Sequence, residues 1–370
     1  MSGSVVGMLA WCWVIWRLMI GSGWEYRAEF ENESSHHPPV SIVVPARNEE
    51  NNIKECLPTL LNQEYPEKQI IVVNDRSTDQ TGDVLNSFDH PDLEVVDGKQ
   101  RPDESWTGKS WAVHQGLQRA EHDWYLFTDA DMEFRPGLLK GALGEASQNK
   151  NQLYSLMPVM PTPGILNKIL LPLMGLILAV LFPLSRVNDP DDSTALAAGG
   201  FMIMHRSLHD RVGGHEAIKN RVAEDLAMAQ NVKKHDGSIR LQYSTRLKTI
   251  MYRTPRETIN GLTKHPLEGI NNSLLLYVLL LSLFVYSFVI PILGVVGLFP
   301  AGQIALISAG TMLVLCHLSI VGIHVQLNHS ILWTLCTVPA VILYVLITLR
   351  AVYQKIVYGG TVWKERVTGQ

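Results

Sequence analysis

Two aspartates separated by one residue, Asp129 and Asp131, follow the apolar run at 124–128. In an extended strand, residues i and i+2 lie on one face roughly 7 Å apart, and a turn that begins there can bring both carboxylates together. Protein-bound Mg²⁺ or Mn²⁺ typically takes one or two carboxylates and completes its shell with water and substrate phosphates. The pair therefore predicts a site for a divalent cation and a diphosphate, although an isolated Asp-x-Asp is more often a solvated turn.

Other polar residues follow the other apolar runs of this half of the chain. Pro45, Arg47 and Glu49 come after the first run, and Asp75 ends the second. Lys109 stands where a helix is expected to begin, so its charge lies beside helix N–H groups, which favour anions. A surface ion pair for Arg47 and helix capping for Asp75 are the structural alternatives.

The elements that must position these residues alternate between strands and helices. Strands are expected over 40–44, 69–73, 93–96 and 124–128, and helices over 49–62, 78–88 and 110–121. This alternation predicts an α/β domain with a mostly parallel, Rossmann-like sheet. Ligands of such sheets bind at the carboxyl ends of the strands. The polar residues that follow the first, second and fourth of these strands fall at that edge.

An apolar region in the C-terminal third predicts membrane helices. The 370 residues are 46% hydrophobic, and the mean hydropathy of +0.08 is high for a wholly soluble protein. Residues 273–349 carry almost no charge and divide into segments of membrane-spanning length at 273–299, 304–325 and 331–349. We therefore expect an integral membrane protein.

Two further apolar stretches bear on the domain organisation. Residues 1–22 include Arg17 and no convincing cleavage site, which indicates an uncleaved anchor. The stretch 165–185 contains prolines and has charged ends, so an interfacial helix is favoured over a span. The expected order is an anchor over 1–22, a linker over 23–39, the α/β domain over 40–270 with this helix inside it, transmembrane helices over 271–350 and a tail over 351–370.

The net charge and the spacing of the cysteines argue against nucleic-acid binding, a disulfide framework and structural zinc. The net charge of −4 and the pI near 6.4 give no basic field of the kind that nucleic-acid binders carry, so no nucleic acid is expected as a partner. The four cysteines are widely spaced and form no zinc-type pair, so neither a disulfide framework nor structural zinc is expected. They are Cys12, Cys56, Cys316 and Cys336.

The polar clusters occur in the order found in the family 2 glycosyltransferases, and the chain resembles that family from Val40 to about Tyr252. The segments that carry the resemblance are Val43–Glu50, Val73–Asp79, Gly108–Lys109 with Ala112 and Gly116, Asp129–Asp131, and Glu224–Asp225. The resemblance implies the GT-A fold, which has a mixed, Rossmann-like sheet. It also implies a nucleotide-sugar donor, most readily a UDP-sugar, and inversion at the anomeric carbon.

The resemblance further implies roles for individual residues. Pro45, Arg47, Glu49, Asp75, Lys109 and Asp129 would bind the nucleotide sugar. Asp131, together with Asp129, would hold Mg²⁺ or Mn²⁺, and Asp225 would be the catalytic base with Glu224 as its neighbour. For Glu224 and Asp225 the structural alternative is that two acids stabilise the positive start of a helix.

Two tryptophan motifs narrow the expected acceptor. Trp106–Lys109 and Trp363–Arg366 resemble the membrane-bound members that glycosylate carotenoid (diaponeurosporenoate-type) or hopanoid lipids. Tyr252–Arg256 stands where processive polysaccharide synthases carry Gln-x-x-Arg-Trp, which favours transfer of a single sugar. We expect a multi-pass enzyme of the cell membrane with a cytoplasmic catalytic domain and a lipid acceptor, either carotenoid- or hopanoid-like or a polyprenyl phosphate. The alternatives are a polysaccharide synthase and a non-catalytic, nucleotide-binding membrane scaffold.

Overall fold

The computed structural model describes residues 26–28, 30, 37–264, 303–327, 329–358, 361–363 and 366–368. The chain divides into two compact units. We call residues 23–161 and 184–251 the α/β unit, and residues 1–22, 162–183 and 252–370 the helical unit. The expected anchor over 1–22 and the expected span over 273–299 lie outside the described residues.

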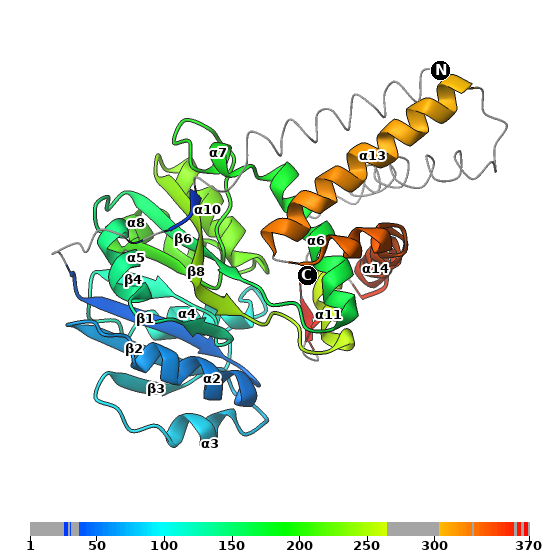
Figure 1. The fold of residues 1–370 in the computed structure, drawn as a ribbon. Helices are drawn as coiled ribbons and strands as arrows, with labels where there is room; N and C mark the ends of the chain where they lie inside the picture. Colours follow the sequence, from blue (N-terminus) through cyan, green and yellow to red (C-terminus); the bar gives the residue numbers. More distant parts are fainter. Residues whose placement is uncertain are drawn as a thin grey trace. The chain divides into compact units, whose positions relative to one another are not determined.

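A mixed sheet of eight strands, in the order β3-β2-β1-β4-β7-β6-β8-β5, forms the centre of the α/β unit (Figure 1). The strands are β1 (Val40–Ala46), β2 (Lys68–Asn74), β3 (Leu93–Asp97), β4 (Trp124–Phe127), β5 (Met132–Phe134), β6 (Gln152–Val159), β7 (Met202–His205) and β8 (Ser238–Thr249). Strands β3, β2, β1 and β4 are parallel to one another. Strand β7 runs antiparallel to β4 and β6, β6 pairs in parallel with β8, and β5 runs antiparallel to β8.

The parallel half of the sheet and its helices confirm the predicted alternation. The helices of the α/β unit are α2 (Glu50–Leu61), α3 (Thr81–Asn86), α4 (Gly108–Leu117), α5 (Leu138–Ala146), α7 (Leu184–Val187), α8 (Arg206–Arg211), α9 (Gly214–Ala217) and α10 (Glu224–Lys234). In α2 the apolar residues Ile53, Leu57 and Leu60 recur three or four positions apart, so they form one buried face. Strands β1 and β2 are apolar throughout their centres because parallel strands are covered on both faces.

The antiparallel strands were not predicted. Strands β5 and β7 contain three and four residues, too few for a hydrophobic period to be recognised. Strand β8 is twelve residues long and alternates buried with exposed positions over much of its length. In the sequence, apolar Ile239, Leu241 and Tyr243 alternate with polar Arg240 and Gln242, and this pattern is the signal that could have predicted the strand.

The helical unit is built from apolar helices that pack on one another. It contains α6 (Gly164–Leu181), α11 (Pro255–Lys264), α13 (Gln303–Gln326), the 3-10 helix η3 (Ile331–Cys336), α14 (Thr337–Tyr358) and a hairpin of β9 (Thr361–Trp363) and β10 (Arg366–Thr368). Its core joins Leu173 and Leu176 of α6 to Ile320 and Ile323 of α13 and to Val341 of α14.

Two described segments are long and apolar enough to cross a membrane, α6 and Ile331–Gln354. Large apolar side chains remain exposed on the second of these, among them Leu332 and Leu335, which are 70% and 77% exposed. Exposed apolar surface on this scale marks contact with a membrane or a partner. These segments are therefore candidates for contact with a bilayer, and α13 also exposes large apolar side chains, among them Ile307 and Leu318.

A matched pair of valines tests the core of the α/β unit. Val72 of β2 is fully buried, whereas Val159 of β6 is 45% exposed. We expect Val72→Ala to lower the free energy of unfolding by about 2 kcal/mol, because two buried methyl groups are lost and a cavity remains. Val159→Ala should change it by less than about 0.5 kcal/mol. Thermal unfolding of the detergent-solubilised protein measures both, and equal effects would contradict this view of the core.

Candidate functional site

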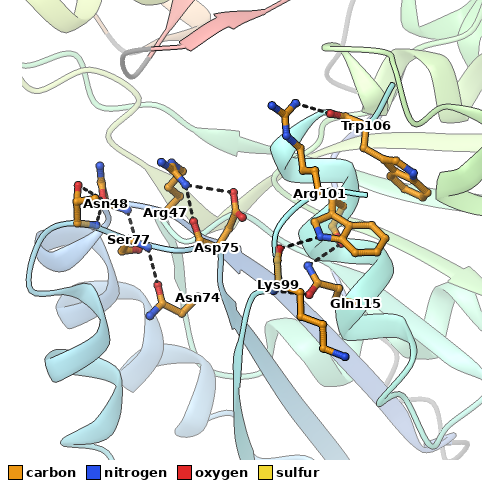
Figure 2. A network of polar contacts seen from close by, with 11 residues as sticks. Arg47, Asn48, Asn74, Asp75, Ser77, Lys99, Arg101, Trp106 and Gln115 are labelled. Atoms are coloured by element: carbon orange, nitrogen blue, oxygen red, sulfur yellow. Dashed lines mark hydrogen bonds and ion pairs between the residues drawn. The ribbon is translucent and has the colours of Figure 1, made fainter. Parts of the chain in front are cut away.

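Hydrogen bonds join the loops that follow β1 and β2 (Figure 2). The Asn48 N–H donates to Ser77 Oγ at 3.0 Å, and the Thr78 N–H donates to Asn48 Oδ1 at 2.8 Å. Asn48 and Arg76 both have positive φ, 52° and 54°, a conformation that asparagine tolerates better than most residues. The network fixes the two loops relative to each other at the carboxyl edge of the sheet.

This network brings Arg47 to Asp75, two of the residues predicted to bind the nucleotide. Arg47 donates to the Asp75 carbonyl oxygen at 2.6 Å, and its guanidinium lies 3.7 Å from the Asp75 carboxylate. Asp75 is buried at the end of β2. At the start of α3, the Thr81 N–H donates to Asp79 Oδ1 at 3.0 Å and not to Asp75.

The loop between β3 and α4 extends the same edge (Figure 2). The Gly98 N–H donates to the Asn74 carbonyl at 2.9 Å, and a Cβ at Gly98 would lie only 2.8 Å from that oxygen, so this close approach requires glycine. Thr107 then caps α4 by accepting from the Ser110 N–H at 3.2 Å. Lys109 consequently lies in the first turn of α4, as predicted.

Lys109 is the cation that holds the acidic residues of the site together. Its Nζ lies 2.6 Å from Asp129 Oδ1 and is also paired with Glu224 Oε1. Burial acts to lower the pKa of Lys109, but Asp129, Glu224 and Asp225 together raise it well above its ordinary value. The lysine is therefore charged and bridges the end of β4 to the start of α10.

Asp131 carries a carboxylate oxygen without a hydrogen-bond partner. Among the described residues, its Oδ1 is buried and accepts no hydrogen bond. Burial, followed by the charges of Asp129 and Glu49, raises the pKa of Asp131 to about 7. An orphaned oxygen among like charges is the environment that a hard cation would stabilise, so Asp131 and Asp129 fit the predicted Mg²⁺ or Mn²⁺ site.

The described residues contain no group of three or more His, Cys, Asp or Glu side chains arranged to hold a metal ion. A cation at Asp129 and Asp131 would draw its remaining ligands from water and from substrate phosphates, as Mg²⁺ commonly does. Cys56 lies beneath the pair, where its thiol donates to the Asp129 carbonyl at 3.9 Å. Burial and the charge of Asp131 raise the pKa of Cys56, so it stays protonated and packs as an apolar group.

Asp225, the predicted base, is fixed by backbone donors. Its Oδ2 accepts from the Gly199 N–H at 3.1 Å, and its Oδ1 accepts from the Leu226 N–H at 2.7 Å. Burial and the neighbouring Glu224 raise the pKa of Asp225 to about 6. A Cβ on residue 199 would lie 3.0 Å from Asp225 Oδ2, so the small residue lets the carboxylate approach the loop before β7.

A pocket at the carboxyl ends of β1 and β4 collects several of these side chains. Its lining consists of Pro45, Lys109, Val113, Phe127, Thr128, Asp129, Gly199, Met202, His215 and Glu224. Pro45, Lys109, Asp129 and Glu224 were predicted for the site. Asp131, Asp225, Arg47, Glu49 and Asp75 were also predicted but do not belong to this lining.

The pocket also contains residues that the sequence did not single out. Phe127, Thr128 and Met202 are ordinary core types, so nothing in their identity marks them. His215 follows Gly213 and Gly214, and a histidine directly after two glycines was the signal that could have drawn attention to it.

Comparison with known proteins covers most of the α/β unit and also includes α6 of the helical unit. Residues 41–213 match the model of glycosyl transferase family 2. Over 195 residues the chain is 28% identical to the 4,4'-diaponeurosporenoate glycosyltransferases of Staphylococcus aureus strains MRSA252 and USA300. The match covers 52% of this chain and 51% of those proteins, so the chain spans about half the length of the curated relatives it matches.

A solved structure extends the likeness in fold. The mannosyltransferase PcManGT from Pyrobaculum calidifontis, solved in complex with GDP-Man and Mn²⁺, superposes with a TM-score of 0.58. It is 16% identical in sequence, and the superposition covers 96% of this chain and 99% of that chain. With the family match, this likeness confirms the expected GT-A-like fold class.

Breaking the pair between Lys109 and Glu224 should destabilise the site. Glu224 is buried, so Lys109→Met would leave a buried carboxylate without its cation, at a cost of about 1–3 kcal/mol. Adding Glu224→Gln removes that charge and should recover most of the loss. Thermal unfolding of both single variants and the double variant measures the coupling. Strictly additive losses would contradict the proposed role of the pair.

The raised pKa of Asp225 predicts a pH-dependent stability. Between its ordinary pKa near 4 and the value of about 6, the folded protein keeps a proton that the unfolded chain has lost. The contribution of Asp225 to stability therefore becomes less favourable as the pH rises through this window. We expect the Tm difference between Asp225→Asn and wild type to be more positive at pH 8 than at pH 4. Asp236→Asn, which changes an exposed carboxylate, is the matched control.

Proposed function

We propose that this chain, whose residues 41–213 match the model of glycosyl transferase family 2, transfers one sugar from a nucleotide-sugar donor to a lipid acceptor at a membrane. The observation that carries the proposal is the meeting of Lys109 with Asp129 and Glu224 at one pocket. A cation between carboxylates at the carboxyl edge of a parallel sheet suits a donor that brings both phosphates and a metal ion.

The nucleoside would bind where β1 and β2 end. Pro45 lines the pocket, and the carboxylate of Asp75 can accept from the N–H of a uracil-like base. Arg47 and Glu49, which also follow β1, would hold the ribose or the first phosphate. The structural neighbour was solved with GDP-Man, so GDP-sugars belong beside UDP-sugars as candidate donors.

A divalent cation would bind at Asp131 and Asp129. The support is the buried, unpartnered Asp131 Oδ1 and the crowding of carboxylates that raises the pKa of Asp131. The structural neighbour was solved with Mn²⁺. When bound, such a cation neutralises charge on the leaving nucleoside diphosphate. Lys109 adds a second positive charge from the first turn of α4.

Asp225 is the candidate base of an inverting transfer. Its pKa of about 6 leaves it ionised at neutral pH yet able to accept a proton from a hydroxyl acceptor. The hydrogen bond from the Gly199 N–H holds the carboxylate beside the pocket, because Gly199 belongs to the lining. An acceptor carboxylate or phosphate is already ionised, and Asp225 would then orient it.

The proposed acceptor is a lipid, with a carotenoid-type or hopanoid-type molecule first and a polyprenyl phosphate second. The apolar segments α6 and Ile331–Gln354 support an acceptor held in a bilayer. The names of the curated relatives, diaponeurosporenoate glycosyltransferases, point to the first class. We further propose a multi-pass protein of the cell membrane whose α/β unit faces the cytoplasm.

Release of nucleoside diphosphate tests the proposal. The detergent-solubilised chain is incubated with a panel of UDP- and GDP-sugars, with Mg²⁺, Mn²⁺ or EDTA, and with or without a total lipid extract. We expect metal-dependent release from one donor that increases when lipid is added. The absence of release from every donor by folded protein would refute the enzymatic proposal and favour the binding scaffold.

Two carboxylate variants separate the roles within that assay. Asp131→Asn should lower metal-dependent release at least about 100-fold, because the cation loses its ligand. Asp225→Asn should lower transfer to a hydroxyl acceptor at least about 100-fold while donor binding stays within a factor of about two. Asp236→Asn serves as the control with an exposed carboxylate. Wild-type release by both site variants would contradict these assignments.

A further inference from the structure

Two buried histidines lie beside the acidic centre and have no part in the assignments above. His209 of α8 and His215 of α9 are 8% and 2% exposed, and His209 Nε2 lies 3.1 Å from His215 Nδ1. The ring of His215 packs against Phe127 of β4, with centroids 4.7 Å apart. His215 also lines the pocket that contains Lys109, Asp129 and Glu224.

The backbone before His215 is shaped to seat this pair. Gly213 and Gly214 have φ of 84° and 56°, a left-handed conformation that favours glycine. A Cβ on Gly214 would lie 2.6 Å from His209 Cε1, so any side chain there would displace the ring. Two consecutive left-handed glycines thus allow α9 to bring His215 against His209.

The hydrogen bonds assign the proton positions of both rings. The Asp210 carboxylate can only accept, so His209 Nδ1, 3.4 Å from Asp210 Oδ1, carries the proton. Burial lowers the pKa of His209, so its ring is neutral and its Nε2 accepts from His215 Nδ1–H. Burial, His209 and Lys109 lower the pKa of His215, which is also neutral. Its Nε2 is therefore left as a bare acceptor.

That acceptor has no partner within the described chain. Among the described residues, His215 Nε2 forms no hydrogen bond, and it points away from His209 because the two nitrogens lie on different sides of the ring. A neutral imidazole nitrogen at a pocket wall accepts hydrogen bonds from neutral donors such as hydroxyl groups. In the proposed function, the sugar must lie between the diphosphate at Lys109 and the base beside Glu224, and His215 lines that same pocket.

We propose that His215 is a specificity-determining residue that accepts a hydrogen bond from a hydroxyl of the transferred sugar through Nε2, with His209 as its positioning residue. This inference rests on the proposed function and adds a recognition element for the sugar itself. It requires a donor whose sugar presents a hydroxyl toward His215. The nucleoside diphosphate alone would make no use of this contact.

Amide substitutions separate the two ring nitrogens. Asparagine reproduces the position of Nδ1 but not that of Nε2, whereas glutamine can place an acceptor near Nε2. We expect His215→Asn to weaken binding of the nucleotide sugar about 3- to 10-fold, the range for one hydrogen bond, and to leave binding of the nucleoside diphosphate unchanged. His215→Gln should recover part of the loss. His235→Asn, at an exposed histidine, is the matched control.

His209 is tested through the same pair of ligands. His209→Phe keeps an aromatic ring but removes the acceptor that fixes His215, so it should weaken nucleotide-sugar binding without affecting the diphosphate. His209→Gln keeps a hydrogen-bonding group near Nε2 and should bind the sugar better than His209→Phe. A purely structural role would weaken both ligands together.

The measurement is isothermal titration calorimetry on the full chain in detergent with Mn²⁺. The ligands are the nucleotide sugar that wild type hydrolyses, its nucleoside diphosphate, and monodeoxy analogues of the sugar. One deoxy analogue should bind more weakly than the parent to wild type but equally to His215→Asn. Equal weakening of nucleotide sugar and diphosphate in His215→Asn, or no weakening, would overturn this inference alone. Wild type that binds neither ligand would overturn the proposed function as well.

Discussion

The positive charge of Lys109 among the carboxylates at the edge of the sheet is the interaction on which the site depends. Glu224 and Asp129 lie close enough to Asp225 to raise the pKa of Asp225, and the charge of Lys109 acts against that effect. Like charges at such separations are tolerated only with a cation nearby. The position of Lys109, set by the Thr107 cap of α4, therefore decides whether Asp129 and Glu224 can line one pocket.

The carboxylates around Lys109 could also bind a second cation. Lys109 contacts Asp129, but Asp131 keeps a buried oxygen without a partner and a pKa near 7. Protein interiors rarely retain such a group unless something else satisfies it during function. A divalent ion with substrate phosphates would satisfy it and would also change the balance of charge around Lys109. Asp129, which pairs with Lys109 in the folded chain, would therefore also take part in binding the divalent ion.

The rigidity of the site comes from neighbouring loops that hydrogen-bond to one another. Asn48 is tied to Ser77 and Thr78, and Gly98 to Asn74, so the loops after three parallel strands form one connected edge. On the other side, Gly199 holds Asp225 and His209 orients His215. Glycine at these close contacts lets backbone N–H groups hold the neighbouring residues in place. The side-chain atoms of the site then stay available for a ligand.

The sequence by itself determined the parallel half of the fold and which acids are candidates for the site, because buried strands such as β1 and β2 are continuously apolar and their polar ends are local features. It did not determine the antiparallel strands β5 and β7, which are too short to show a period. Tertiary structure alone decided that Lys109 pairs with Glu224 and that His215 lines the pocket. These contacts join residues far apart in the chain, and only the packing of α4, α9 and α10 around the sheet brings them together.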